Sequence, residues 1–270
     1  MVTVSVLVAI YVGWLVGGPT WAELRRARIR RRPFPQAWRD TLKRRVPLFR
    51  SLPADLQLQL KKHVQVFIAE KTFIGCQGVV IDDEIRVTVA AQACLLQLNR
   101  RADYYPNLQQ ILIYPSAFVV DRTHTDSMGV QHAQKRALLG ESWSQGQVIL
   151  SWEDTHAAST ASAPGHNLVI HEFAHQLDQE NGAANGFPRL QRRSHAKRWT
   201  AVMTAEYERL RQAVFMQEPS LLDPYGATDP AEFFAVTSET FFEQPLRMAN
   251  EHPDLFAVLA RFYRINPLSW

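Results

Sequence analysis

Apolar positions follow a helical spacing in some stretches of the chain and form short β-rich runs in others. Residues 54–69 and 194–215 have the pattern of helices, the second with one apolar side. Residues 110–120 and 147–152 are rich in Ile, Val and aromatic residues and predict strands. Residues 121–146, which lie between these runs, are polar and predict a loop. The pattern therefore predicts several helices and two or three strands.

A different pattern opens the chain. Residues 2–22 carry no charge, and as a helix they would span about 30 Å of hydrocarbon. A cleaved signal peptide is the alternative, but no basic region precedes the run and no clear small-x-small cleavage site follows it. We therefore expect an uncleaved membrane anchor with its basic flank in residues 1–33, a linker in residues 34–53, and a folded domain in residues 54–270.

Residues 168–178, with the sequence LVIHEFAHQLD, place two imidazoles and a carboxylate on an otherwise apolar segment. His171 and His175 are four residues apart, so on a helix both rings leave the same face and can bind one tetrahedral cation. Glu172 then lies beside the metal, where a general base for a zinc-bound water is needed. The pattern predicts a Zn²⁺ site. The same spacing can also arise by chance on an ordinary amphipathic helix, so a third ligand is needed.

Two glutamates compete for the third position. Asp229 as N-cap and Pro230 at the first helical position predict a helix in which Glu232 is the third residue. A carboxylate there can close a capping box, or it can stay ionised at the helix N-terminus and bind zinc. Glu239 lies seven residues further on, on the same side. Metzincins are excluded, because their third histidine would fall at Asn181.

Three segments together resemble the Mlc titration factor A family of bacterial zinc metallopeptidases, whose catalytic domain is similar to that of anthrax lethal factor. The segments lie in residues 113–120, 171–178 and 225–235. The resemblance covers roughly residues 45–268. It implies a zincin-like (gluzincin) α+β fold, mainly helical with a small mixed sheet, for the zinc metallopeptidase domain.

The resemblance also implies a ligand set and an activity. It places one Zn²⁺ between His171, His175 and Glu232, with Glu172 as the catalytic base. It implies peptidase activity of the aminopeptidase type on peptide or protein substrates. The family is named for sequestering a transcriptional repressor, so the alternative is a regulatory binding protein with a latent or structural zinc site.

Three more residues are candidates with an ordinary alternative. Tyr225 resembles a tyrosine that donates a hydrogen bond to the developing oxyanion, and without the resemblance it would be a loop tyrosine. His132 resembles a histidine that can take the remaining metal position in a latent state, and by itself it would be a surface residue. Asp178, close after His175 on the predicted helix, is expected to orient an imidazole. Its alternative is a plain polar residue at the helix end.

Charge and cysteine content bear on location and partners. The net charge is +4, but residues 1–50 hold eleven Lys or Arg against two acidic residues, so the remainder is net negative. This gives no reason to expect a nucleic acid partner. Six arginines follow the apolar run, and the positive-inside rule then predicts a single-pass protein of the bacterial inner membrane with a cytoplasmic catalytic domain. The protein would be soluble and cytoplasmic if residues 2–22 are not inserted. Cys76 and Cys94 predict reduced thiols.

Overall fold

The computed structural model describes residues 20–116, 118–125, 131–138, 140–143, 146–158, 166–190 and 192–270. The helices are α2 (Gln36–Arg45), α3 (Pro47–Ser51), α4 (Ala54–Glu70), α5 (Asp83–Leu95), α6 (Trp152–Ala158), α7 (Leu168–Asp178), α8 (Ala196–Met216), α9 (Pro230–Glu243), α10 (Pro245–Glu251) and α11 (Pro253–Tyr263). The strands are β1 (Thr72–Gly75), β2 (Gln110–Tyr114), β3 (Phe118–Thr125), β4 (Gln131–Leu138), β5 (Gly140–Trp143) and β6 (Gln147–Ser151).

Four of these strands form one mixed sheet in the order β1-β2-β6-β5. The pairs β1–β2 and β2–β6 are parallel, and β5 runs antiparallel to β6. In the central strands Ile111 pairs with Val148 and Ile113 with Leu150, and all four side chains are buried. A mostly helical fold with a small sheet was expected from the resemblance and is confirmed.

The polar segment between the central strands is not the loop that its composition predicted. It contains β3 and β4, which pair as an antiparallel hairpin, and β5, which joins the main sheet. The residues of β4 and β5 are mostly polar, with neither a continuous hydrophobic run nor a regular alternation of polar and apolar positions, so periodicity gave a weak signal there.

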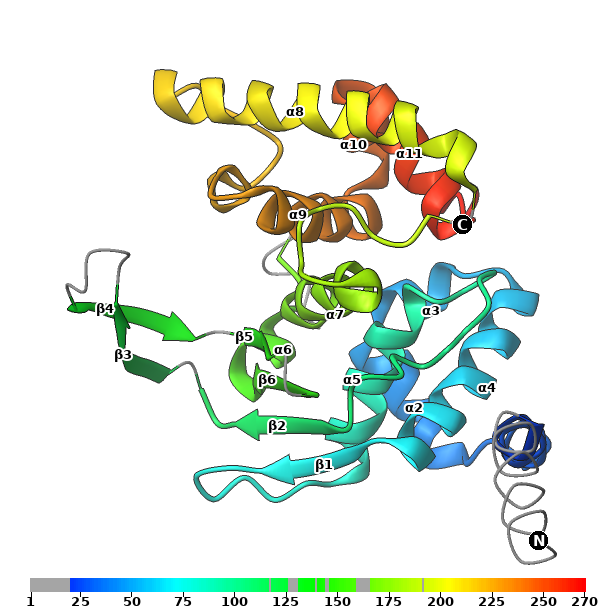
Figure 1. Cartoon of the computed structure of the whole chain (residues 1–270). Helices are drawn as coiled ribbons and strands as arrows, with labels where there is room; N and C mark the ends of the chain where they lie inside the picture. Colours follow the sequence, from blue (N-terminus) through cyan, green and yellow to red (C-terminus); the bar gives the residue numbers. More distant parts are fainter. Residues whose placement is uncertain are drawn as a thin grey trace, which may run out of the picture.

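Helix α7 lies between two halves of the molecule (Figure 1). The sheet with α4 and α5 is on one side, and α8, α9 and α11 are on the other. Phe173 of α7 anchors the first side, because its ring lies 4.8 Å from that of Tyr105 and 5.7 Å from that of Phe67, and all three side chains are fully buried or nearly so. Aromatic pairs at such distances add to the gain from burial. The apolar face of α7 is thus fixed in the core, which sets the direction of its polar face.

Residues 34–53, which we expected to be a linker, form α2 and α3 and join the core. Leu42 is completely buried and Phe49 is 2 % exposed. The helix before them, over residues 20–30, is also attached, since Arg26 makes two 2.8 Å bonds to the carboxylate of Glu70 and lies 4.8 Å from the ring centre of Tyr104. Part of the predicted basic flank is therefore bound to the folded domain.

The predicted membrane anchor, residues 2–22, lies almost entirely outside the described residues. Among the residues that the structure does describe, no helix is long and apolar enough to cross a membrane.

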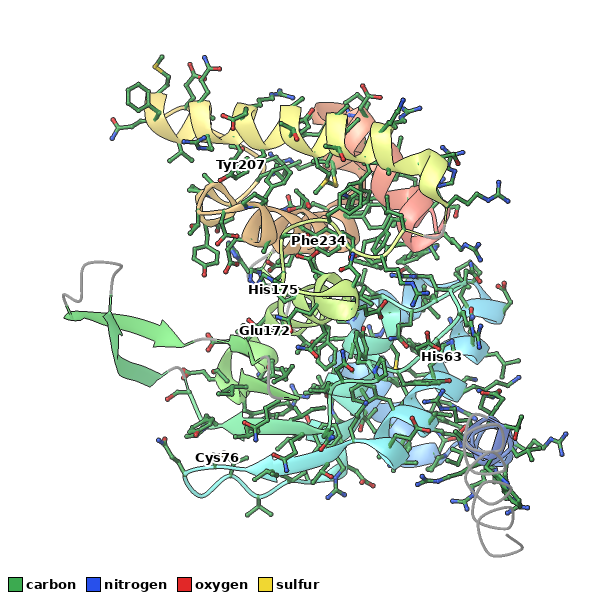
Figure 2. The ribbon with its side chains drawn as sticks, in the orientation of Figure 1. His63, Cys76, Glu172, His175, Tyr207 and Phe234 are labelled. Atoms are coloured by element: carbon green, nitrogen blue, oxygen red, sulfur yellow. The ribbon has the colours of Figure 1, made fainter. Side chains whose placement is uncertain are left out.

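Buried His63 should make the fold sensitive to acid. Its Nδ1 lies 2.8 Å from the hydroxyl oxygen of Tyr104 (Figure 2), and burial, aided by the charge of Arg30, lowers its pKa to about 4. The unfolded chain has a histidine pKa near 6.5, so it binds more protons than the folded chain between pH 6.5 and 4. The contribution of His63 to the free energy of unfolding is therefore fully present above pH 6.5. It is lost as the pH falls towards and below 4, by about 3 kcal/mol in total.

Chemical denaturation of the His63→Gln variant at pH 7 and pH 4.5 checks this prediction. The variant should lose less stability on acidification than the wild type. The exposed His166 supplies the control, since His166→Gln should keep the wild-type response. Equal acid sensitivity of all three proteins would contradict the prediction.

Candidate metal centre

Helix α7 begins and ends at residues suited to those positions. The side chain of Asn167 caps its N-terminus by accepting a 3.0 Å hydrogen bond from the amide of Ile170. A short 3₁₀ turn, Gln179–Asn181, follows the helix and ends at Gly182. The φ of Gly182 is 142°, a value that glycine adopts freely but that is strained for other residues. The helical part of this segment thus ends before Gly182. The helix therefore has a defined length that presents His171 and His175 one turn apart.

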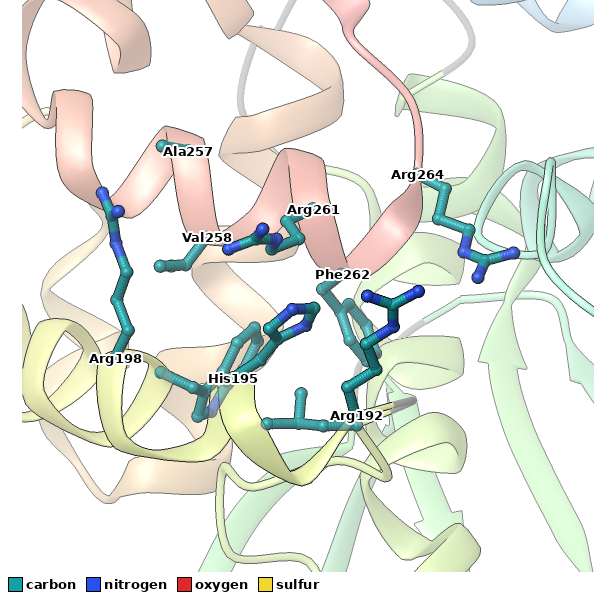
Figure 3. Close-up of a pocket in the computed structure, with 10 residues that line it drawn as sticks. Arg192, His195, Arg198, Ala257, Val258, Arg261, Phe262 and Arg264 are labelled. Carbon is teal, nitrogen blue, oxygen red and sulfur yellow. The ribbon is translucent and has the colours of Figure 1, made fainter.

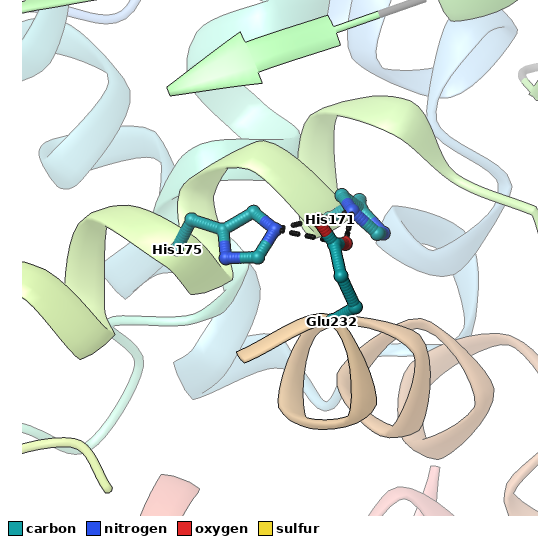
Figure 4. A group of neighbouring side chains, drawn as sticks. All are labelled: His171, His175 and Glu232. Atoms are coloured by element: carbon teal, nitrogen blue, oxygen red, sulfur yellow. Dashed lines mark hydrogen bonds and ion pairs between the residues drawn. The ribbon is translucent and has the colours of Figure 1, made fainter. Parts of the chain in front are cut away.

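Helix α9 brings a carboxylate to these two rings. Asp229 caps it by accepting from the amides of Ala231 and Glu232, and Pro230 occupies the first turn, as the sequence predicted. Oε2 of Glu232 lies 3.0 Å from Nε2 of His171 and 3.3 Å from Nε2 of His175 (Figure 4). The side chain of Glu232 thus points at the imidazoles, and the cap of the helix is supplied by Asp229.

The three converging atoms fit a metal ion. Nδ1 of His171 lies 2.7 Å from Oε1 of Glu239, so its hydrogen is directed there and Nε2 carries a lone pair. This lone pair faces Glu232 Oε2 and, at 3.2 Å, the Nε2 of His175. Three electron-rich atoms so close together repel one another unless a cation lies between them. Tetrahedral zinc with bonds of about 2.0–2.1 Å separates its ligand atoms by about 3.3 Å, which matches these distances.

The pKa values of His171 and Glu232 are shifted by the close approach of the imidazoles and the carboxylates. Burial by itself lowers the pKa of His171, but the contacts with Glu232 and Glu239 outweigh it and raise this pKa well above its usual value. Burial raises the pKa of Glu232, yet the two imidazoles shift it in net far below its usual value. A proton on His171 and a metal ion therefore compete for the same negatively charged site.

Glu239, the rival third ligand, holds the first imidazole instead of joining the three converging atoms. Its Oε1 binds Nδ1 of His171, and its Oε2 accepts a 2.6 Å hydrogen bond from the amide of Asn167. The side chain of Asn167 in turn donates to Glu243 at 3.0 Å. One carboxylate thus fixes both the orientation of His171 and the start of α7. Spacing had placed Glu239 on the correct face, but it could not reveal this supporting role.

Glu172 and Tyr225 border the cluster. Glu172 follows His171 on α7 (Figure 2) and is 3 % exposed. Tyr225 lies in the 3₁₀ turn Pro224–Ala227, and its hydroxyl donates a 3.2 Å hydrogen bond to Oε1 of Glu232. With 44 % of its surface exposed, Tyr225 lies where the cluster meets solvent. Tyr225 is therefore close enough to act on a molecule bound at the cluster, whereas Glu172 is linked to the cluster by its place next to His171 and by the effect of its charge, which raises the pKa of that imidazole.

Asp178 makes contacts other than the expected bond to an imidazole. Its Oδ2 accepts hydrogen bonds of 2.7 Å from the amides of Asn185 and Gly186. Gly186 has a φ of 74°, and a Cβ atom there would lie 2.3 Å from the carbonyl oxygen of Pro230. Asp178 thus holds a turn that touches the start of α9. It supports the position of Glu232 through the backbone, a role that its place in the sequence did not indicate.

His132 lies on β4, and its side chain is outside the described part of the structure. Its role as a fourth ligand remains a prediction.

Comparison with known proteins identifies the family. Residues 21–264 match the family described as glucose-regulated metallo-peptidase M90. The chain belongs to this family. As an M90 metallopeptidase it acts on peptide bonds with the help of a metal ion, and among the described side chains His171, His175 and Glu232 form a group whose donor atoms could hold such an ion.

Relatives of this M90 metallopeptidase carry the name that the resemblance gave. Mlc titration factor A of Escherichia fergusonii is 36 % identical over 234 residues, 86 % of each chain. That of Serratia proteamaculans is 35 % identical over 235 residues, 86 % of this chain and 88 % of the relative. An uncharacterized protein of Synechocystis sp. is 38 % identical over 268 residues, 99 % of this chain and 97 % of the relative. The predicted resemblance to the Mlc titration factor A family is confirmed.

The two glutamates of α9 should differ in their effect on metal binding. Glu232→Ala removes one of three converging donors and should abolish tight binding, because two imidazoles alone bind zinc weakly. Glu239→Ala removes only the bond to Nδ1 and should weaken the affinity by about 10–100-fold. Competition with a chromophoric chelator measures both. Glu243→Gln is the control and should bind nearly as the wild type does. Complete loss of metal in Glu239→Ala, with retention in Glu232→Ala, would make Glu239 the ligand.

Proposed function

We propose that this protein is a zinc-dependent peptidase of the aminopeptidase type. The observation that carries the proposal is the convergence of two imidazole nitrogens and one carboxylate oxygen, with a buried carboxylate, Glu172, next to the first imidazole. This donor set suits Zn²⁺, which favours histidine and carboxylate ligands with an open fourth position in catalytic sites. Membership of a metallopeptidase family supports the same conclusion.

His171, His175 and Glu232 would hold the Zn²⁺. When bound, the ion would act as a Lewis acid, which lowers the pKa of water and polarises the scissile carbonyl group. Glu172 would accept the proton of the attacking water and then deliver it to the leaving amine, because Glu232 is one of the converging donors and both oxygens of Glu239 are already bonded to His171 and Asn167. Glu239 keeps Nε2 of His171 directed at the site through its 2.7 Å bond to Nδ1.

Tyr225 would stabilise the negative charge that develops on the carbonyl oxygen. Its hydroxyl donates to Oε1 of Glu232, the oxygen that does not contact the imidazoles. Because its ring is partly exposed, a small rotation transfers this hydrogen bond from Glu232 to a substrate oxygen. Such a donor acts most strongly on the transition state, where the charge is largest.

The second candidate is a regulatory binding protein that sequesters a transcriptional repressor. It is favoured by the name of several relatives, Mlc titration factor A. In this case the zinc site would be latent or structural, with His132 as a fourth ligand. The number of protein ligands on the metal distinguishes the two, because a catalytic site keeps one position open.

Replacing Glu172 tests the peptidase mechanism. Glu172→Gln removes the base but none of the three converging donors, so the variant should bind metal as the wild type does and lose activity by at least about 10²-fold. Peptide hydrolysis and bound metal are measured on the same sample. Glu218→Gln, an exposed change of the same kind, is the control and should be fully active. Near wild-type turnover by Glu172→Gln would rule out the proposed role.

The substrate class is tested with a panel of aminoacyl compounds and peptides with free or blocked N-termini, assayed with and without a chelator. An aminopeptidase should hydrolyse only the unblocked compounds, and the chelator should abolish this activity. Equal cleavage of blocked peptides would indicate an endopeptidase. No metal-dependent cleavage of any compound would favour the regulatory binding protein.

A further inference from the structure

A cavity lies between the start of α8 and helix α11, outside the metal centre (Figure 3). It measures about 520 Å³, a size typical of small-molecule sites. Its lining comes from residues before and within the first turn of α8 and from residues near the C-terminal end of α11. It includes none of the residues assigned to the metal centre or to the proposed peptidase mechanism.

Positive charge surrounds the opening of this cavity. Arg192, Arg198, Arg261, Arg264 and His195 contribute to its lining, and Figure 3 shows Arg192, His195 and Arg261 around a common space. Arg198 is paired with Asp254 at 3.1 Å. Within the described part of the chain, no carboxylate forms an ion pair with any of the other three arginines; Arg264 instead makes a 3.4 Å bond to the carbonyl oxygen of Asn99. The guanidinium groups of Arg192 and Arg261 thus face the cavity, and among the described residues neither has a carboxylate within ion-pair distance.

The histidine in this group responds to the positive charge. The pKa of His195 is lowered, first by partial desolvation and then by the charges of Arg261 and Arg192. The field at the opening therefore favours anions, and guanidinium groups bind phosphate and carboxylate oxygens through two parallel hydrogen bonds.

The floor of the cavity is apolar. Trp199 is 3 % exposed and Phe262 is 7 % exposed, and their ring centres lie 5.3 Å apart. Val258 and Leu190 extend this surface. A charged rim above an aromatic floor suits a ligand with one anionic end and one apolar end, whereas a free inorganic ion would use only the rim.

We propose that this cavity is a second ligand site, which takes a small organic anion. Its phosphate or carboxylate group faces Arg192 and Arg261, and its apolar part lies on Trp199 and Phe262. The limited volume of the cavity favours a small molecule over nucleic acid, which needs an extended basic stripe.

The ligand would contact Trp199, and this side chain also contacts residues close to the metal centre. The indole nitrogen of Trp199 donates a 3.2 Å hydrogen bond to the carbonyl oxygen of Gly186, in the turn that Asp178 holds. The indole ring also lies 5.8 Å from that of Phe234, two residues after Glu232 on α9. Trp199 therefore links the cavity to two segments next to Glu232, the turn at Gly186 and helix α9.

Phenyl phosphate and benzoate are the probes, and neutral benzyl alcohol is the matched uncharged compound. Binding to the full-length, zinc-loaded protein is measured by calorimetry at low salt. The imidazole of His195 is followed by NMR, with its signal assigned from the His195→Gln variant. At least one anionic probe should bind, benzyl alcohol should bind at least tenfold more weakly, and the pKa of His195 should rise on saturation because an anion favours the imidazolium.

A double variant, Arg192→Gln with Arg261→Gln, should weaken binding of the anionic probe at least tenfold. The control is Arg211→Gln with Arg247→Gln, which removes the same charge from exposed sites elsewhere and should leave the affinity within twofold of the wild type. The single Arg261→Gln variant replaces the double variant if the latter does not fold. Unchanged binding in the cavity variants, equal binding of benzyl alcohol, or probe-induced shifts at His171 and His175 without one at His195 would each overturn the proposal. A phosphate-only or carboxylate-only response identifies which anionic group the site prefers.

Discussion

The hydrogen bond between His171 and Glu239 is the interaction on which the metal centre depends. It fixes the imidazole tautomer, so that Nε2 carries a lone pair. This lone pair is directed at the same point as Nε2 of His175 and Oε2 of Glu232. Without that bond the ring could rotate and hydrogen-bond to Glu232 by itself. With it, three electron-rich atoms are held together at a cost that a metal ion or a proton on His171 relieves. The second oxygen of Glu239 binds the backbone of Asn167, so the cap of α7 and the orientation of its first imidazole are set together.

The position of Glu232 depends on a separate chain of contacts. Helix α9 is capped by Asp229, and Pro230 follows the cap directly. The carbonyl of Pro230 packs against Gly186, whose amide is bound by Asp178 at the end of α7. A side chain larger than hydrogen at Gly186 would collide with this carbonyl and push α9 from α7. The two helices that carry the ligand atoms are thus joined at both ends of the site.

The sequence predicted the parts of this site that local rules control. The i, i+4 spacing of the histidines and the cap at Asp229 follow from helix geometry and could be found without the fold. The functions of Glu239 and Asp178 could not, because each depends on a partner from a distant segment. The same reason explains the error at residues 34–53. Their helices are short and polar on much of their surface. The burial of Leu42 and Phe49 becomes visible only in the fold, where α2 packs against α5 and α3 packs against α2.

A metal ion at this site would also stabilise the fold of the whole molecule. His171 and His175 belong to a helix whose apolar face is fixed by Phe173 against the half that contains the sheet, whereas Glu232 begins a helix that packs with α8 and α11. Coordination therefore joins the two halves across the polar face of α7, in parallel with the apolar contacts of α9. An ion that binds the folded chain but not the unfolded one adds its binding free energy to stability. Without the ion, a proton on His171 would be left to join its imidazole to Glu232, and the loss of stability would fall first on the boundary between α7 and α9.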